Sequence, residues 1–258
     1  MSKITQAFEN NKAFIAFITC GDPDLETTET AIRAAVSGGA DLIELGIPFS
    51  DPTAEGPVIQ GANLRALKGG ITTDKIFAFV ENLRQDITVP MVFMTYSNVV
   101  FSYGAEDFLS ACSRLSIDGL ILPDLPFEEK EEFLPVCRKY GIDLISLIAP
   151  TSKDRIAKIA KEAEGFLYIV SSLGVTGVRN EIQTNLKAIV DIVRQNTSIP
   201  CAIGFGISTP KQARKMAELA DGVIVGSAIV KFLEQYGTSA PEYIRSYVKS
   251  MKDAMDVL

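Results

Sequence analysis

The chain has 258 residues, of which 47% are hydrophobic, and a formal net charge of −7. This length accommodates two small domains or one large α/β domain with a substantial core. The acidic balance and the absence of a basic run argue against nucleic acid as a partner, and no stretch approaches the ~20 apolar residues of a membrane span. Residues 1–12 lack a long apolar region and a cleavage site, which argues against secretion.

The sequence contains no histidine. Ser/His/Asp and Cys/His nucleophilic systems and His-ligated metal sites are therefore excluded. Acid/base chemistry near neutral pH must fall to carboxylates, Tyr, Lys or Cys. The four cysteines have no C-x-x-C spacing, so we expect reduced thiols, no metal centre and a cytoplasmic protein. They are Cys20, Cys112, Cys137 and Cys201.

Predicted strands and helices alternate along the chain. Ile4 and Phe8 predict a short amphipathic helix over 2–10, ahead of the first strand. Apolar runs bounded by turn residues predict eight strands: 13–19, 41–47, 91–96, 119–125, 143–149, 165–171, 201–206 and 222–226. Amphipathic segments after them predict helices at 25–38, 74–86, 105–115, 128–140, 153–163, 185–195 and 210–219, followed by carboxyl-terminal helices.

Eight strand-then-helix units in about 250 residues fit a closed (β/α)8 TIM barrel. The strands are continuously apolar, which is typical of a parallel sheet covered by helices. We therefore expect a single domain over 1–258 with an extra N-terminal helix. An open, doubly wound sheet is the alternative, but the first strand-to-helix turn, CGDPD at 20–24, lacks a dinucleotide-binding fingerprint.

Glu44 lies within the otherwise hydrophobic strand 41–47. Burying an ionised carboxylate without a partner is costly, so its presence there indicates a special role. The following loop, 48–57, adds Asp51 and Glu55 among prolines. This layout is typical of an acid/base site at the carboxyl end of a strand. The alternative is that Glu44 pairs with an Arg or Lys in the core and the loop is only a connector.

Other side chains are expected at the carboxyl ends of the strands, where TIM barrels hold their active sites. They are Phe17, Thr19, Met94, Tyr96, Asn98, Asp124 and Tyr168. Asp124 could instead cap the helix after its strand, and the two tyrosines could be packing residues. Glycine loops at 174–177, 204–208 and 225–228, with a short helix near Ser227, predict a phosphate site, although tight strand-to-helix packing also requires glycines.

Taken alone, these residues predict a metal-independent enzyme that uses carboxylate acid/base catalysis on a phosphorylated, partly apolar molecule. Seven segments further resemble the tryptophan synthase alpha subunit family, in order and spacing and across essentially the whole chain. They are ELGIPFSDP (44–52), GPVIQ (56–60), MTYSN (94–98), PDLP (123–126), GVTG (174–177), GFGIS (204–208) and VGSAIVK (225–231).

The resemblance implies a retro-aldol cleavage of indole-3-glycerol phosphate to indole and glyceraldehyde 3-phosphate. It implies no cofactor in this chain, because pyridoxal phosphate belongs to the partner beta subunit. The expected assembly is a heterotetramer of two alpha and two beta subunits, in which indole passes to the beta subunit. We expect the loop 48–57 to contact that partner, since a rigid exposed loop loses little entropy on docking.

The resemblance also implies residue roles. Glu44 matches the acid/base that protonates the indole ring carbon and deprotonates the neighbouring glycerol hydroxyl. Glu55 matches a second carboxylate, normally Asp, that binds the indole N–H, and Thr176 matches the residue that hydrogen-bonds this carboxylate in the closed state. The implied indole pocket consists of Phe17, Met94, Tyr96, Asp124, Tyr168 and Phe205. The implied phosphate contacts are Gly177, Gly206, Gly226 and Ser227.

Three positions depart from the family pattern. Glu55 is one methylene longer than Asp, Thr53 replaces an apolar residue, and Ser172 stands where Arg is frequent. Because a misplacement of ~1 Å can cost about 100-fold in rate, we expect the fold and substrate to be retained while isolated activity is low or partner-dependent. The alternatives are a catalytically weak subunit that mainly activates the beta subunit, and another sugar-phosphate enzyme with a phosphate-binding barrel.

Overall fold

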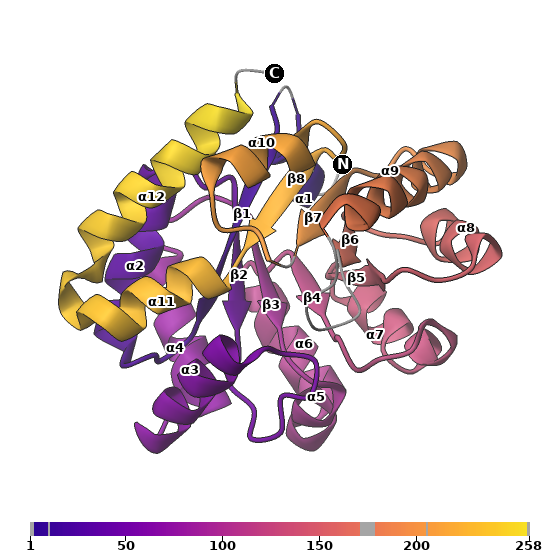
Figure 1. Ribbon diagram of the computed structural model, residues 1–258. Coiled ribbons are helices and arrows are strands. Elements are labelled where there is room, and N and C mark those ends of the chain that lie inside the picture. The colour runs from indigo at the N-terminus through magenta and orange to yellow at the C-terminus, as the bar shows by residue number, and fades with distance from the viewer. Residues whose placement is uncertain (1–2, 10, 171–178, 205, 257–258) are drawn as a thin grey trace.

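The computed structural model describes residues 3–9, 11–170, 179–204 and 206–256 (Figure 1). Within these residues, eight parallel strands are hydrogen-bonded in chain order, and the last pairs with the first to close a barrel. The strands are β1 Ala13–Thr19, β2 Leu42–Gly46, β3 Met91–Met94, β4 Gly119–Ile121, β5 Asp143–Ile148, β6 Leu167–Val170, β7 Cys201–Gly204 and β8 Gly222–Val225. The predicted TIM barrel and its eight strands are confirmed.

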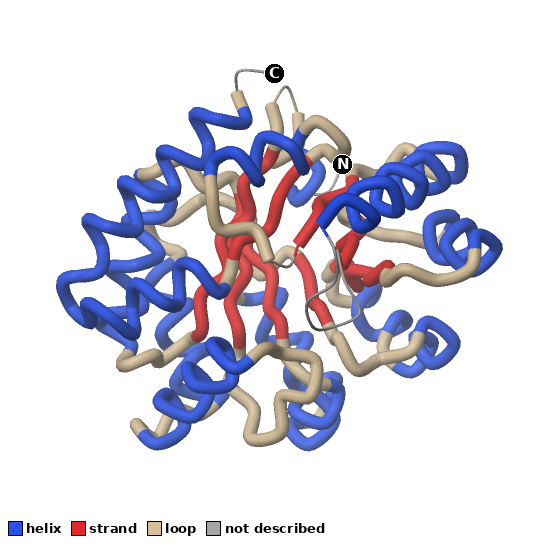
Figure 2. Tube along the Cα trace, in the orientation of Figure 1, coloured by secondary structure: helices blue, strands red, loops and turns tan. Residues whose placement is uncertain are grey.

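Helices α2 to α12 surround the strands on the outside of the barrel, and the short α1 precedes the first strand (Figure 2). In chain order the helices are α1 Lys3–Gln6, α2 Leu25–Ser37, α3 Pro57–Lys68, α4 Thr73–Leu83, α5 Ser97–Tyr103, α6 Ala105–Arg114, η1 Phe127–Glu132, α7 Leu134–Lys139, α8 Lys153–Lys161, α9 Arg179–Asn196, α10 Pro210–Ala217, α11 Ser227–Tyr236, η2 Gly237–Ser239 and α12 Ala240–Met255. Several begin at side-chain caps. Asp24 caps α2 through the Thr27 N–H, and Thr209 forms a capping box with Gln212 at α10.

The structure differs from the predicted elements in three places. The helical region after β2 is two helices, α3 and α4, separated by residues 69–72, which include Gly69 and Gly70. The helix expected over 128–140 begins as the 3₁₀ helix η1 and continues as the short α7. Helix α5 was not predicted at all. It is separated from α6 by Gly104, whose φ of 95° is a left-handed conformation that favours glycine.

The core forms two layers, one inside the barrel and one between strands and helices. Ile15, Leu42, Val92 and Phe166 belong to the inner layer, together with Ile4 from α1. Ile43, Leu45 and other alternate strand residues pack outward against the helices. Because Ile4 is fully buried in the inner layer, α1 helps to fill the barrel interior.

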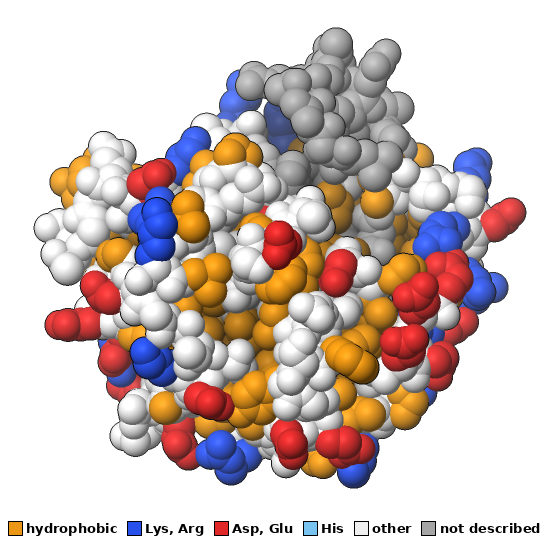
Figure 3. Space-filling view, turned by 90° about the horizontal axis from the view of Figure 1, so that it is seen from below, with side chains coloured by type: hydrophobic (Ala, Val, Ile, Leu, Met, Phe, Trp, Pro, Cys, Tyr) orange, Lys and Arg blue, Asp and Glu red, His pale blue; other side chains and the backbone are white. Residues whose placement is uncertain are grey.

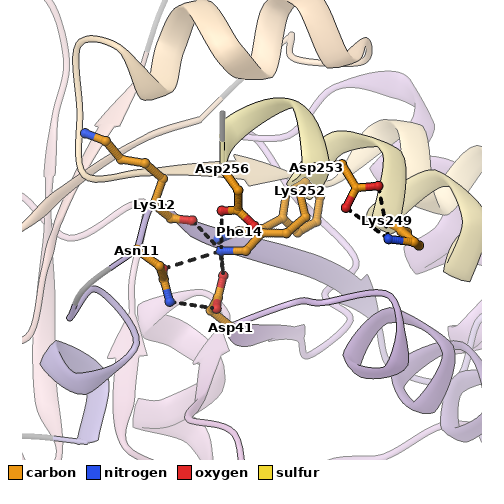
Figure 4. Close-up of polar contacts among 8 residues, drawn as sticks. All are labelled: Asn11, Lys12, Phe14, Asp41, Lys249, Lys252, Asp253 and Asp256. Atoms are coloured by element: carbon orange, nitrogen blue, oxygen red, sulfur yellow. Dashed lines mark hydrogen bonds and ion pairs between the residues drawn. The ribbon is translucent and has the colours of Figure 1, made fainter. Parts of the chain in front are cut away.

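A polar network fastens α12 to the amino end of the barrel (Figure 4). Lys252 Nζ donates to the main-chain oxygen of Lys12 at 2.7 Å and lies 2.8 Å from Asp41 Oδ2. The same Asp41 oxygen accepts from the N–H of Phe14 at 2.7 Å. These contacts hold the start of β1, the residue before β2 and the last helix together. The network therefore lies at the end of the barrel opposite the loops that follow the strands.

Candidate active site at the carboxyl end of the barrel

The β1–β2 register places Glu44 inside the barrel. Phe17 is its partner on β1, and Val92 is its partner on β3. On β2 the neighbouring Ile43 and Leu45 pack outward, whereas Leu42 belongs to the inner layer. The two-residue period of a strand therefore directs Glu44 inward, next to that apolar layer.

The Glu44 carboxyl is desolvated and unpaired. The residue is 1% exposed, and neither carboxyl oxygen has a hydrogen-bond partner among the described residues. No described Lys or Arg offsets its charge, so the alternative of a core ion pair finds no support. Burial, and then the negative charge of Glu55, raise the pKa of Glu44 to about 8. Near neutral pH the group holds a proton that it can deliver.

Glu55 lies in the loop between β2 and α3 and is held by α3. Its Oε2 accepts from Asn63 Nδ2 at 2.5 Å, and its main-chain oxygen accepts from Gln60 Nε2 at 2.8 Å. Burial raises the pKa of Glu55 to about 7, while the hydrogen bond from Asn63 acts in the opposite direction. The site therefore contains two carboxyl groups with pKa values raised toward neutral pH, and the charge of Glu55 contributes to the shift of Glu44.

An apolar wall lies beside the two carboxyl groups. Phe17 packs with Ile59 and Ala62 of α3 and with Val230 of α11, and Met94 packs against this cluster. Another inward aromatic residue, Tyr168 of β6, has its pKa raised well above the usual value by burial and by the charge of Glu44. The arrangement provides a flat apolar surface next to an acid, which suits an aromatic substrate that must be protonated.

Glycines at the strand ends make room for the aromatic rings. A Cβ on Gly46 would lie 2.7 Å from Phe17 Cζ, and one on Gly226 would lie 3.1 Å from Phe17 Cδ1. A Cβ on Gly204 would lie 2.6 Å from Tyr168 Oη. Gly226, one of the predicted phosphate contacts, must therefore also be small because Phe17 packs against it. This agrees with the alternative interpretation, in which tight packing requires the glycines of these loops.

Tyr96 joins the end of β3 to the loop 48–57. Its hydroxyl accepts from the N–H of Ala54 at 3.0 Å, and its ring stacks on Phe49 with centroids 5.0 Å apart. Tyr96 is buried and immediately precedes α5. Its contacts therefore hold the loop in which Glu55 lies.

Asp124 caps a helix, but not the one after its own strand. Its Oδ1 accepts from the N–H and the hydroxyl of Ser97, at 3.0 and 3.1 Å, at the start of α5. The side chain is exposed, at the edge of a groove of about 280 Å³ that Phe101, Pro126 and Phe133 also line. Asp124 is therefore a helix cap, as the alternative interpretation proposed, but it caps α5 and not the helix after its own strand.

Only part of the predicted phosphate site lies within the described residues. Helix α11 begins at Ser227, as predicted, and Gly226 is its N-cap. Gly206, with a φ of 75°, follows β7 and is exposed. Thr176, Gly177 and Phe205 lie outside the described residues, as does Ser172.

Sequence reasoning missed the contribution of α3. Ile59, Ala62 and Asn63 share one face of this helix at the i, i+3, i+4 spacing, and all three are buried. That spacing was available as a signal, but nothing local indicates that the face meets Phe17 and Glu55. Thr19, which was expected near the site, is buried with its hydroxyl unpaired among the described residues.

The described residues contain neither a metal-binding cluster nor a membrane-spanning helix. No three His, Cys, Asp or Glu side chains there are grouped so that they could hold a metal ion. Within the same residues, no helix has the length and apolar character needed to cross a membrane. The four cysteines are all buried and free.

Comparison with known proteins identifies the family. The family model described as tryptophan synthase alpha chain matches residues 4–256. The chain belongs to this family. It is 52% identical over 256 residues to the tryptophan synthase alpha chain of Lacticaseibacillus casei, covering 99% of this chain and 96% of that one. It is 49% identical to that of Lactiplantibacillus plantarum, covering 99% and 97%.

Solved structures agree. The crystal structure of tryptophan synthase subunit alpha from Legionella pneumophila str. Paris has a TM-score of 0.90 and 36% identity, covering 100% of both chains. The resemblance read from the sequence is confirmed. As a member of the tryptophan synthase alpha chain family, the protein is a lyase of tryptophan biosynthesis that cleaves indole-3-glycerol phosphate, and the family implies a beta subunit as partner. The alternative of an unrelated sugar-phosphate enzyme is excluded.

Proposed function

We propose that the cleavage proceeds by acid/base chemistry between Glu44 and Glu55, in one domain that spans the chain. The observation that supports this most directly is the Glu44 carboxyl, buried inside the barrel without a partner among the described residues. A group in such a position favours its protonated form. It can therefore act as a general acid near neutral pH, as a reaction that begins with protonation of a carbon requires.

In the proposed reaction Glu44 first gives its proton to the indole ring carbon that carries the glycerol phosphate chain. The ring becomes cationic. The resulting Glu44 carboxylate then removes the proton from the hydroxyl next to the ring, and the carbon–carbon bond breaks. Its electron pair returns to the ring, which gives neutral indole and an aldehyde, glyceraldehyde 3-phosphate. Glu44 ends protonated, as it began, so the proton balance closes.

Glu55 stabilises the cationic ring by accepting a hydrogen bond from the indole N–H. This role requires its ionised form, because the charge to be stabilised is positive. Burial of the Glu55 carboxyl strengthens the interaction, since charges act more strongly where water is excluded. Thr176 is proposed to hydrogen-bond this carboxylate when the loop that carries it closes over the substrate.

The substrate is proposed to lie with its indole ring against the apolar wall and its phosphate at the amino end of α11. Phe17, Met94, Tyr96, Tyr168 and Phe205 would line the ring, with Ile59, Ala62 and Val230 as further contacts and Asp124 at the edge of the pocket. Gly177, Gly206, Gly226 and Ser227 would bind the phosphate. A helix amino terminus and glycine loops after the last strands suit an anion.

The beta subunit is proposed to dock on the loop 48–57 and on α5. Phe101 of α5 is 76% exposed, and loop residues Asp51, Thr53 and Ala54 are exposed beside Phe49 and Tyr96. Figure 3 shows hydrophobic side chains gathered in the middle of the face seen from below Figure 1, to which this loop belongs. An apolar patch with a charged rim is typical of a protein interface.

The proposed assembly is a cytoplasmic heterotetramer of two alpha and two beta subunits. Within it, indole is passed from the alpha subunit to the beta subunit. Pyridoxal phosphate is assigned to the beta subunit alone, and every proton transfer proposed above uses side chains of this chain. The three departures at Thr53, Glu55 and Ser172 lead us to expect low isolated activity that the partner raises.

Steady-state cleavage of indole-3-glycerol phosphate, with and without a beta subunit, tests this function. We expect slow turnover by the isolated chain, acceleration by the partner, and loss of turnover in Glu44→Gln. Glu55→Asp should alter the rate without abolishing it. If neither condition gave turnover while the beta subunit was still activated, the chain would be a regulatory subunit rather than a catalyst.

A further inference from the structure

We infer that Asn63 helps to decide which of the two glutamates carries the proton, by holding Glu55 in its ionised form so that Glu44 is the acid. The inference rests on the proposed function and makes Asn63 a positioning residue for it. Asn63 acts through Glu55, and no substrate contact is assigned to it.

The two carboxyl groups receive different hydrogen bonds. Glu55 Oε2 accepts from Asn63 Nδ2 at 2.5 Å, whereas neither oxygen of Glu44 has a donor among the described residues. A hydrogen bond donated to a carboxylate favours the charged form. Asn63 itself is 4% exposed on α3, so water has little access to replace its amide. The asymmetry therefore favours charge on Glu55 and a proton on Glu44.

The surrounding charged groups do not distinguish the two, whereas burial acts in the same direction as Asn63, because Glu44 is more deeply buried than Glu55. Glu55 is faced by Glu44 from β2 and by Tyr96 from the end of β3, with Asp124 acting on the same tyrosine. On α3 the nearest cation in sequence is Arg65, and it is committed to Asp22 at 2.7 Å and to Glu234 of α11 at 3.0 Å. Within the described part of the chain, no Lys or Arg forms an ion pair with Glu55. Among the described residues, Asn63 is the side chain that donates a hydrogen bond to the Glu55 carboxyl.

The order of ionisation agrees with this geometry. Two desolvated carboxyl groups, of which Glu55 raises the pKa of Glu44 through its charge, do not both ionise easily and titrate as a pair. The pKa of about 7 for Glu55 and about 8 for Glu44 make Glu55 the first to lose its proton. Between these two pH values the state with one proton, carried by Glu44, is the most populated.

The placement of this proton matters for the proposed chemistry. With the proton on Glu44, the acid faces the substrate and the anion can accept from the indole N–H. With the proton on Glu55, Glu44 has nothing to donate and Glu55 cannot offset positive charge. Both states carry the same total charge, so local differences select the productive one: the deeper burial of Glu44 and the hydrogen bond that Asn63 donates to Glu55.

Infrared titration of the carboxyl groups tests the inference without requiring activity. In a Glu44→Gln background, Glu55 titrates without its neighbour, and its protonated carbonyl band can be followed against pH. Adding Asn63→Leu, which is close in size but donates nothing, should raise the apparent pKa of Glu55 by about one pH unit. Asn63→Gln keeps an amide donor, so the apparent pKa of Glu55 should lie between its values with Asn63 intact and with Asn63→Leu. Asn63→Ala also removes the donor and should raise this pKa like Asn63→Leu, with a smaller side chain.

Gln60→Met is the matched control, because Gln60 lies on the same helix and binds only the main-chain oxygen of Glu55. Gln60→Met should leave the apparent pKa of Glu55 unchanged. In active protein with the beta subunit, Asn63→Leu should move the acidic limb of the pH profile of kcat/KM upward by roughly 0.5 to 1 pH unit, and Gln60→Met should not.

An unshifted Glu55 pKa in both Asn63→Leu and Asn63→Ala would overturn the inference. So would a rate loss equal at every pH, which would indicate a structural role only. Failure of the proposed function is seen separately, since Glu44→Gln would then retain turnover whatever the Glu55 titration showed.

Discussion

The hydroxyl of Tyr96 accepts a hydrogen bond from the N–H of Ala54 at 3.0 Å, which joins the end of β3 to the residue before Glu55. Tyr96→Phe removes this acceptor but keeps the ring that stacks on Phe49. A typical hydrogen bond contributes about 0.5–1.5 kcal/mol. We therefore expect kcat/KM for indole-3-glycerol phosphate to fall by up to about tenfold while global stability changes little. Unchanged kcat/KM would show that the loop is held by other contacts.

Gly204 lies against the ring of Tyr168, so an added methyl group must displace the tyrosine. A Cβ there would lie 2.6 Å from the hydroxyl and 2.7 Å from Cε1. Overpacking of this kind typically costs about 1–3 kcal/mol, and Gly204→Ala should lower both the free energy of unfolding and the affinity for an uncleavable indole propanol phosphate. Gly56→Ala is the control for stability, because a Cβ there meets nothing within 4 Å. Equal stability of the two variants would contradict the packing described here.

Stability should depend on pH through Glu44. Its pKa is raised in the fold to about 8 from an ordinary value of 4.5, so the folded state binds the proton more tightly than the unfolded state. The free energy of unfolding should therefore fall as pH rises between these two values, by an amount on the order of a few kcal/mol. Glu44→Gln removes this dependence and should be more stable than wild type at about pH 9, with the advantage vanishing near pH 4. Urea unfolding followed by circular dichroism measures it, and a constant difference at all pH values would refute the assignment.

Arg65 is the partner of the fully buried Asp22, with Nε and Nη2 lying 2.7 and 2.9 Å from its two carboxyl oxygens. Arg65→Met leaves that carboxylate buried without its cation, which typically costs about 3–5 kcal/mol. The double variant with Asp22→Asn should recover much of the loss, because the charge that needs a partner is gone. Denaturant unfolding of the two single variants and the double variant would show this coupling. Additive effects would mean that the two residues contribute independently.

The barrel could be predicted because its evidence is local. Apolar runs bounded by turn residues define the strands, and a helix such as α2 is marked by its apolar face and by Gly38 and Gly39 at its end. Glu44 stood out because a carboxylate in a hydrophobic strand is costly wherever the strand lies.

The parts that were missed depend on contacts between distant segments. Helix α5 has the β-branched sequence SNVVFSY, which has weak helix propensity. Its first turn is capped by Asp124 from the loop after the next strand, 27 residues away. Asn63 likewise has no significance in the sequence until α3 is folded back on Glu55. Periodicity predicts which face of a helix is buried, but not which residue that face meets.

The most direct test of the account is indole release from indole-3-glycerol phosphate by the isolated chain, comparing wild type with Glu44→Gln. The chain contains no Trp, so the fluorescence of released indole and of a bound indole analogue can be read without tryptophan background. We predict that Glu44→Gln binds the analogue with near wild-type affinity and releases no measurable indole. Release at the wild-type rate by Glu44→Gln would contradict the assignment of Glu44 as the acid and with it the mechanism built on the buried carboxyl.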